Sequence, residues 1–295
     1  MSKTKNAFGI LTLATQNDYL KAIGLALSVR VSNPGVQIAV ACSSNVKPLV
    51  APFFDFVIDE QPGLKGFVHK VYLDRYSPFL ETIFFDSDVL IFKPVRPYVE
   101  SWGPGPYYAC GHFYSTGKSA FGMDWPTVLK KIGKPQLVVV DGAGHAFFRQ
   151  PHCTTVFDLA REITREHKNY AGDIPYADED VINIAMTMLD LQPAPFTDFF
   201  ARYMSAMPGT MEMDATKSLC RFVAVQNGQP FEPCMVHFAA NEASVAYTCQ
   251  LFALFRKFGV PTRGLLLIGA ADFYEREIKM PLSNLLKMTK RLIGQ

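Results

Sequence analysis

Short apolar runs alternate with longer segments of helical periodicity in the first 59 residues. The apolar runs, typical of buried strands, cover residues 7–14, 36–42 and 54–59. Residues 18–31 repeat apolar side chains at helical spacing, and residues 45–52 form a shorter segment of the same kind. A β-α-β-α-β order with short turns predicts an open, mostly parallel α/β sheet with helices packed on its faces.

The rest of the chain continues the pattern less regularly. Helices are predicted at residues 70–79, 154–168, 178–189, 241–258 and 271–293. Strands are predicted at residues 81–86 and 89–92, and as a pair within 136–149. No internal repeat or clear linker divides the chain. We therefore expect residues 1–240 to form one α/β domain, with residues 241–295 as a helical C-terminal extension packed on it.

Composition narrows the class of protein. The chain has 295 residues, 49% of them hydrophobic, which is enough for a sizeable core, and its formal net charge of +2 gives no electrostatic case for a nucleic-acid partner. The six cysteines form no CxxC pair and no zinc-spaced cluster, which is typical of reduced, buried thiols. Because no signal-peptide core and no stretch of about 18 uninterrupted apolar residues is present, we expect a cytoplasmic protein without a membrane anchor.

Two carboxylates, Asp86 and Asp88, come at the end of the apolar run 81–86. If the strand continued through both residues, the carboxylates would share one face of the sheet and repel each other. A divalent cation such as Mg²⁺ or Mn²⁺ removes the repulsion, because it takes oxygen ligands and usually shares its sphere with substrate phosphates. Ligands of open α/β sheets bind at the carboxyl ends of the strands. The pattern predicts a metal–diphosphate site, and the alternative is a solvated turn.

A phosphatase of the haloacid-dehalogenase type is a second alternative, since it also carries an apolar-Asp-x-Asp sequence. Asp86 would then be the nucleophile and Asp88 a general acid/base. In that class the sequence normally ends the first core strand and precedes Gly-Thr. Here it follows three strand–helix units and precedes Val-Leu-Ile.

The turn after the first predicted strand and the segment before the aspartates support the metal–diphosphate interpretation. The turn carries Thr12, Leu13, Thr15, Tyr19 and Lys21 in order, and Lys70 lies sixteen residues before Asp86. These two blocks resemble glycogenin and its relatives in glycosyltransferase family 8, which have the GT-A fold.

The resemblance assigns roles to the residues of both blocks. It implies that the nucleoside of a UDP-sugar donor contacts Leu13, Ala14, Thr15 and Tyr19. It also implies that Lys70 contacts the donor sugar or diphosphate, beside Ser87 and the two aspartates. A fixed cation there would offset charge on the leaving group.

Three later blocks extend the resemblance. Asp141–Phe148 resembles the strand beneath the sugar, which implies a donor contact at Gly144, although Gly142 stands where the family has Asn. Asp178–Asn183 resembles the block that reaches the transferred sugar. This implies that Asp178 or Glu179 orients the sugar or acts beside its anomeric carbon. Met235–Phe238 resembles the strand whose histidine, here His237, is the third protein ligand of the metal.

Together the blocks imply a hexosyltransferase that holds Mn²⁺ or Mg²⁺ with Asp86, Asp88 and His237. The family transfers sugar with retention of anomeric configuration, either by attack from the leaving-group side or by double displacement through a carboxylate. The resemblance leaves the acceptor open among glycans, proteins and lipid-linked molecules.

One block departs from the family. A Gly and a Lys that clamp the diphosphate are expected after His237, but the chain reads Ala239-Ala240-Asn241-Glu242. The departure keeps a third alternative open, a non-catalytic protein that binds nucleotide-sugars.

The C-terminal residues 281–293 combine apolar and basic side chains. Leu282, Leu285, Leu286 and Ile293 lie near one face of the predicted helix, and Lys287, Lys290 and Arg291 lie towards the other. Such a helix suits peripheral contact with an anionic inner membrane face, and equally suits an ordinary surface helix.

Overall fold

The computed structural model describes residues 6–141, 144–239, 245–274 and 279. They divide into two compact units, and each unit is built from several stretches of the chain. The first unit holds residues up to 17, 36–86 and 95–197, and the second holds 18–35, 87–94 and those from 198 onward. The expected boundary at residue 240 stays a prediction.

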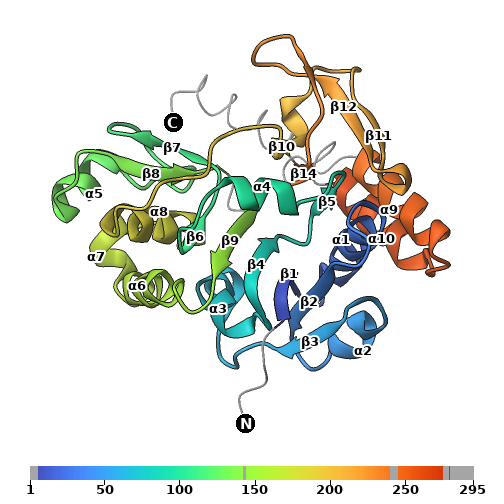
Figure 1. The fold of residues 1–295 in the computed structure, drawn as a ribbon, viewed down its shortest axis with the longest axis horizontal. Helices are drawn as coiled ribbons and strands as arrows, with labels where there is room; N and C mark the ends of the chain where they lie inside the picture. The colour runs from blue at the N-terminus through green and yellow to red at the C-terminus, as the bar shows by residue number, and fades with distance from the viewer. Residues whose placement is uncertain (1–5, 142–143, 240–244, 275–278, 280–295) are drawn as a thin grey trace. The chain divides into compact units, whose positions relative to one another are not determined.

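A six-stranded sheet in the order β3-β2-β1-β4-β9-β6 forms the centre of the first unit (Figure 1). Its parallel strands are β1 (Asn6–Ala14), β2 (Gln37–Cys42), β3 (Phe56–Asp59) and β4 (Phe79–Phe85). Two antiparallel strands, β9 (His145–Arg149) and β6 (Tyr107–Tyr108), complete the sheet beside β4. Because β2 and β3 lie on one side of β1 and β4 lies on the other, the strand order reverses between β1 and β4.

Apolar side chains explain why these strands are central. Leu11 on β1 lies opposite Phe84 on β4, and both are buried in the core of the first unit. Strands buried on both faces read as continuous apolar runs, which is what Ile38–Cys42 does on β2.

Helices of the first unit surround this sheet. They are α2 (Lys47–Val50), α3 (Leu73–Tyr76), α4 (Arg96–Ser101), α5 (Trp125–Ile132), α6 (Thr154–Arg165), α7 (His167–Ala171) and α8 (Asp178–Met188), with 3₁₀ turns η1 (Ala51–Phe53) and η2 (Gly66–Tyr72). The α6 helix buries Val156, Phe157, Ala160 and Ile163, one face at helical spacing. The α8 helix is buried almost all round, because it packs on α6 and on a separate two-stranded antiparallel sheet of β7 (Gly111–Tyr114) and β8 (Leu137–Val140).

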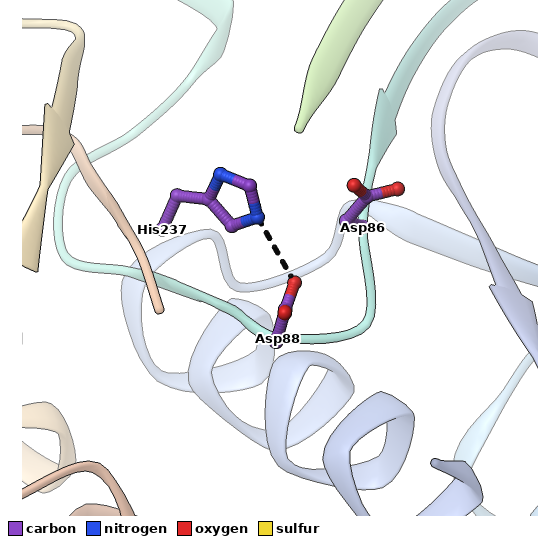
Figure 2. A group of neighbouring side chains, drawn as sticks. All are labelled: Asp86, Asp88 and His237. Carbon is purple, nitrogen blue, oxygen red and sulfur yellow. Dashed lines mark ion pairs between the residues drawn. The ribbon is translucent and has the colours of Figure 1, made fainter. Parts of the chain in front are cut away.

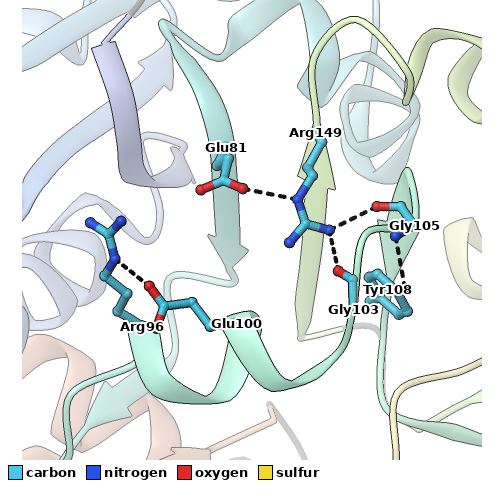
Figure 3. A network of polar contacts seen from close by, with 7 residues as sticks. All are labelled: Glu81, Arg96, Glu100, Gly103, Gly105, Tyr108 and Arg149. Atoms are coloured by element: carbon cyan, nitrogen blue, oxygen red, sulfur yellow. Dashed lines mark hydrogen bonds and ion pairs between the residues drawn. The ribbon is translucent and has the colours of Figure 1, made fainter.

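A network around Arg149 holds the Gly-Pro loop at 103–106 against the sheet (Figure 3). The guanidinium of Arg149 donates to Glu81 on β4 and to the carbonyl oxygens of Gly103 and Gly105, all at 2.7–2.9 Å. The backbone N–H of Gly105 donates to the Tyr108 hydroxyl at 2.9 Å. Separate from this network in the figure, Arg96 pairs with Glu100 one turn along α4.

Two small sheets and three helices form the described part of the second unit. One sheet has the order β10-β14-β5, and the other β11-β12-β13. Their strands are β5 (Val89–Ile91), β10 (Phe200–Arg202), β11 (Glu212–Asp214), β12 (Leu219–Val223), β13 (Pro230–Phe231) and β14 (Met235–His237). The helices are α1 (Tyr19–Ser32), α9 (Val245–Lys257) and α10 (Arg263–Phe273), and the 3₁₀ turns are η3 (Tyr203–Ser205) and η4 (Ala215–Lys217).

The α1 helix is the centre of the second unit. Its residues from Ala22 to Val29 are buried, and it packs against both β5 and α9. The Ser28 hydroxyl accepts a hydrogen bond from the Ile91 backbone N–H at 3.1 Å. Gly24 has no side chain because Leu251 of α9 fills that space, and a Cβ there would lie 2.2 Å from the leucine.

Most strands and helices predicted within the described residues are confirmed, with shifts of one to three residues at their ends. The α10 helix is an exception, because it begins at Arg263, eight residues before the predicted start at 271. The two strands predicted within 136–149 are β8 and β9, which belong to different sheets. Residues 70–79 are not one helix: the 3₁₀ turn η2 leads into the single α-helical turn α3, and the segment before Pro78 becomes extended. The α5 helix was not predicted. Asp124 caps it by accepting from the Thr127 N–H, and Gly133 ends it with a φ of 67°.

The predicted membrane-surface helix at 281–293 lies outside the described residues. Within the described part of the chain, none of the helices combines the length and apolar character needed to cross a membrane.

Candidate active site

The carboxyl ends of β1 and β4 are neighbours, because the two strands are parallel and adjacent. Leu13 and Ala14 end β1, and the exposed Thr15 follows. Asp86 follows β4 at the same edge, so the first unit brings the predicted nucleoside turn and the first aspartate to one end of the sheet. Tyr19 begins α1 in the second unit.

The strand that ends at Phe85 does not continue through Asp88, so the two carboxylates do not share a face of one sheet. Asp86 to Asp88 form a turn, and β5 then joins a different sheet. The Asp86 backbone N–H donates to the Gly144 carbonyl oxygen at 3.0 Å, which fixes the start of the turn. A turn allows the two carboxylates to approach one point, as a bound ion requires.

Pairing of β5 with β14 brings His237 to Asp88. His237 lies opposite Val89 in the antiparallel register, and the Phe238 N–H donates to the Asp88 carbonyl oxygen at 2.9 Å. The His237 Nε2 lies 3.1 Å from the Asp88 Oδ1. This geometry lies wholly within the second unit.

Asp86, Asp88 and His237 form a candidate metal centre. One ligand atom of each residue lies within 4.8 Å of the others, and Figure 2 shows the imidazole directed at Asp88 with the Asp86 carboxylate nearby. The side chain of His237 is 8% exposed, and those of Asp86 and Asp88 are 21% and 20% exposed. Two carboxylates and one imidazole that remain partly open are a donor set that Mn²⁺ accepts and that leaves positions for substrate oxygen atoms.

The ammonium group of Lys70 lies between two carboxylates in the first unit. Its Nζ is 2.9 Å from the Asp86 Oδ2 and 3.2 Å from the Asp178 Oδ2. Burial alone would lower the pKa of Lys70, but attraction by Asp178 and Asp86 outweighs it and raises the pKa well above its ordinary value. Lys70 is therefore a permanent cation beside the candidate metal ligand Asp86.

Three acids occupy the first turn of α8, where their charges suit the helix dipole. Asp178 is the first helical residue and pairs with Lys70. Burial, with repulsion from Asp178, Asp180 and Asp141, raises the pKa of Glu179 to about 7. Burial likewise raises the pKa of Asp180 to about 6, although a hydrogen bond from Ser119 opposes the shift.

A small cavity of about 20 Å³ lies beside Lys70 and Asp178. Tyr107 and His145 also line it, and it is large enough for about one water molecule. The Cys110 backbone N–H donates to the His145 Nε2 at 3.0 Å, so this nitrogen carries no proton. Sequence reasoning assigned no role to His145 and did not consider Tyr107, which is brought here by an antiparallel strand pairing.

Asn183 has a structural role in the described structure. Its Oδ1 accepts a hydrogen bond from the Val140 backbone N–H at 2.9 Å, which joins α8 to β8. The block from Asp178 to Asn183 thus places acids at the start of the helix and a strand contact in its interior.

Comparison with solved structures identifies the fold. The galactosyltransferase LgtC, in complex with donor and acceptor sugar analogs, superposes with a TM-score of 0.54 and 15% identity, over 87% of this chain and 99% of that chain. An active-site mutant of LgtC gives a TM-score of 0.55 and 16% identity with the same coverage. The apo bifunctional glycosyltransferase WbbM gives 0.53 and 10%, over 86% of this chain and 52% of WbbM, so this chain spans about half of that protein.

No protein-family model and no curated protein sequence matches the chain. At these identities the superpositions establish the fold alone, and that fold is GT-A, as the resemblance to glycosyltransferase family 8 implied.

Proposed function

We propose that the chain is a metal-dependent glycosyltransferase that transfers a hexose from a UDP-sugar. The observation that carries the proposal is the group of Asp86, Asp88 and His237 at the carboxyl end of β4. In an open α/β sheet this end, at the reversal of strand order, is where ligands bind.

Mn²⁺ or Mg²⁺ would be held by Asp86, Asp88 and His237, and would supply a Lewis acid that stabilises charge on the leaving diphosphate. The cationic Lys70 supports this assignment, because its ammonium is held within 3.2 Å of both Asp86 and Asp178. We assign Lys70 to the diphosphate, where it takes over part of the role of the missing Gly and Lys after His237.

The donor contacts proposed here follow the family resemblance. They are Leu13, Ala14, Thr15 and Tyr19 for the nucleoside, and Ser87 and Gly144 beside the diphosphate and sugar. Asp178 holds the Lys70 ammonium in place, and Glu179 lies at the transferred sugar. We propose transfer with retention of configuration.

Location and acceptor are also proposals. The resemblance to glycosyltransferase family 8 supports a cytoplasmic enzyme, and the basic amphipathic residues 281–293 support peripheral contact with the inner membrane face. The position of the aspartates after β4, instead of after the first strand, gives no support to the phosphatase alternative.

Incubation of the full chain with UDP-glucose, UDP-galactose or UDP-N-acetylglucosamine tests the proposal. We expect slow release of UDP that requires Mn²⁺ or Mg²⁺ and stops after addition of a chelator. Asp88→Asn should abolish both UDP release and metal-dependent UDP binding measured by calorimetry. Asp173→Asn, a change of an exposed acid on the same chain, is the matched control.

Three outcomes would separate the alternatives. UDP binding that ignores Mn²⁺ and survives Asp88→Asn would overturn the metal assignment. Metal-dependent UDP binding without turnover of any UDP-sugar would favour a non-catalytic binding protein. Hydrolysis of p-nitrophenyl phosphate that depends on Asp86 would favour the phosphatase.

A further inference from the structure

The strand β7, which pairs with β8 in a two-stranded antiparallel sheet, exposes adjacent aromatic side chains. All three side chains from His112 to Tyr114 are exposed, and Phe113 and Tyr114 are each 41% accessible. Adjacent apolar groups that remain exposed on a folded chain often mark a site of interaction. Figure 1 shows this two-stranded sheet with α5 beside α8, all within the first unit.

Four rings on β7 and its neighbours form a continuous row. His112 stacks on Phe196 with ring centres 4.6 Å apart, and meets Tyr114 edge-on at 6.3 Å. Tyr114 in turn lies 5.1 Å from Trp125, at the start of α5. We call Phe196, His112, Tyr114 and Trp125 the aromatic row. His112 and Tyr114 occupy alternate positions of β7 and so share one face of the strand.

The loop after β7 supports one end of the row. Gly117 has a φ of 126°, and a Cβ on it would lie 2.5 Å from the Trp125 ring, so glycine lets the backbone pass close over the indole. The Trp125 backbone N–H donates to the Gly117 carbonyl oxygen at 3.1 Å, which holds the loop against the start of α5. The close approach of Gly117 and the Tyr114 ring 5.1 Å away restrict the orientation of the indole, which lowers the entropy cost of binding.

Three hydrogen bonds join this assembly to the helix that carries the acids. The Val138 and Val140 backbone N–H groups donate to Thr187 and Asn183 of α8, at 2.8 and 2.9 Å. The Ser119 hydroxyl donates to the Asp180 Oδ2 at 3.0 Å. These bonds connect the loop and strand that flank the aromatic row to the helix that carries Asp178 and Glu179, within one unit.

We propose that the aromatic row is the binding surface for a neutral oligosaccharide acceptor, an inference that rests on the proposed glycosyltransferase function. The apolar face of a pyranose ring, made of C–H groups, stacks on aromatic rings, while its hydroxyl groups remain available to polar neighbours. The row itself contains no lysine, arginine or carboxylate. The nearby Lys118 faces Asp124 at 4.0 Å, so a charged ligand would find no unpaired partner in this pair.

Tryptophan fluorescence gives a direct test, because the chain has two tryptophans and only Trp125 belongs to the row. Trp102 is buried against Tyr108 and Phe147, and Trp102→Phe leaves Trp125 as the sole reporter. Titration of this variant of the full chain with maltohexaose, chitohexaose and lacto-N-neotetraose should give a saturable change in emission with at least one of them.

Single substitutions in the row should weaken that binding. Tyr114→Ala and His112→Ala, each made in the single-tryptophan background, should raise the dissociation constant by about five- to tenfold. Phe258→Ala, which removes an exposed ring of the second unit, should leave the dissociation constant unchanged. Melting temperatures identify any variant that fails to fold. If one of the two variants of the aromatic row does not fold, the dissociation constant of the other tests the proposal.

The inference and the proposed function fail in different ways. Metal-dependent UDP binding together with no fluorescence response to any of the three oligosaccharides would overturn the acceptor surface alone. A response that persists in both row variants would do the same. Absence of UDP binding would overturn the proposed function, whatever the oligosaccharides do.

Discussion

At the scale of single residues, the ammonium group of Lys70 lies beside Asp86, one of the carboxylates proposed to bind the metal. Lys70 pairs with the candidate ligand Asp86 and with Asp178. Breaking a largely buried ion pair from one side is costly, because the remaining charges lose their compensation without regaining water. Lys70 therefore stabilises the site before the metal arrives.

Lys70→Met removes this charge and keeps most of the apolar length of the side chain. In the presence of a chelator we expect the free energy of unfolding to fall by about 2–4 kcal/mol, measured by urea denaturation. Lys134→Met breaks the more exposed pair with Asp190 and should cost less than about 1 kcal/mol. Equal losses in the two variants would show that Lys70 does not compensate the two acids.

Glu179 makes stability depend on pH. Burial and neighbouring acids raise its pKa from 4.5 to about 7 in the folded chain. Between these two values the folded state holds more protons than the unfolded state, so the free energy of unfolding falls as the pH rises. Below this window the carboxyl is protonated in both states, and above it the loss is complete.

Glu179→Gln removes the ionisable group and should flatten this slope. At about pH 8 we expect the variant to be more stable than the parent by about 1–3 kcal/mol, and the gain should shrink towards about pH 5. Urea denaturation at a series of pH values measures it. Glu162→Gln, at an exposed position on α6, is the control, and a Glu179 variant that tracks this control at every pH would contradict the assignment.

At the scale of elements, β8 pairs with β7 and is also held by side chains of α8. Asn183 is fully buried, and its Oδ1 is the acceptor for the Val140 N–H. Asn183→Ala leaves this N–H unpaired in the interior and should cost about 1–3 kcal/mol of unfolding free energy. Hydrogen exchange gives the local readout, because the Val140 amide should lose protection.

Two comparisons make this prediction specific. The Val138 amide donates to Thr187 instead and should lose less protection than Val140 in the same sample. Asn169→Ala changes an exposed residue and should have no measurable effect on either amide. Equal loss of protection at both valines would mean that the helix and strand separate as one unit.

The pattern of apolar and polar residues predicted the strands and helices whose formation depends on neighbouring residues. The β-α-β-α-β opening and the strand before Asp86 are confirmed, since apolar runs and helical spacing are properties of neighbouring residues. The predicted end of β4 at residue 86 lies one residue from the observed end at Phe85. The sequence did not predict that β5 pairs with β14, whose residues lie far along the chain.

The candidate metal site likewise combines features that the sequence predicted with features that depend on contacts between distant segments. Sequence order identified Asp86, Asp88 and His237, which the structure brings within 4.8 Å, and metal binding by them stays a prediction. The pairing of Lys70 with Asp178 and the cavity beside Tyr107 arise from packing between distant segments. No pattern of neighbouring residues carries that information.

At the scale of the whole molecule, the second unit depends on residues from both ends of the chain. The α9 helix, expected to be part of a C-terminal extension, packs on α1 from the N-terminal region. Leu251, Leu254 and Phe255 of α9 are fully buried, and Tyr247 stacks on Phe238 with ring centres 4.5 Å apart.

Leu251→Ala tests how much this contact stabilises the second unit. The side chain fills the space above Gly24, so its removal should leave a cavity and cost about 2–5 kcal/mol in urea denaturation. Leu267→Ala on α10 is the matched control, because that leucine is 76% exposed and should change stability by less than about 0.5 kcal/mol. A small loss at Leu251 would mean that α9 contributes little to folding.

Removal of every residue after position 240 makes the stronger test. The predicted boundary treats residues 1–240 as the domain, but α1 would then lose the apolar surface of α9 that covers it. We expect the fragment to bind a hydrophobic dye and to unfold without a single cooperative transition, because a core helix of the second unit would face water. If residues 1–240 instead unfold cooperatively and bind UDP with Mn²⁺ as the full chain does, α9 is an accessory and the predicted boundary holds.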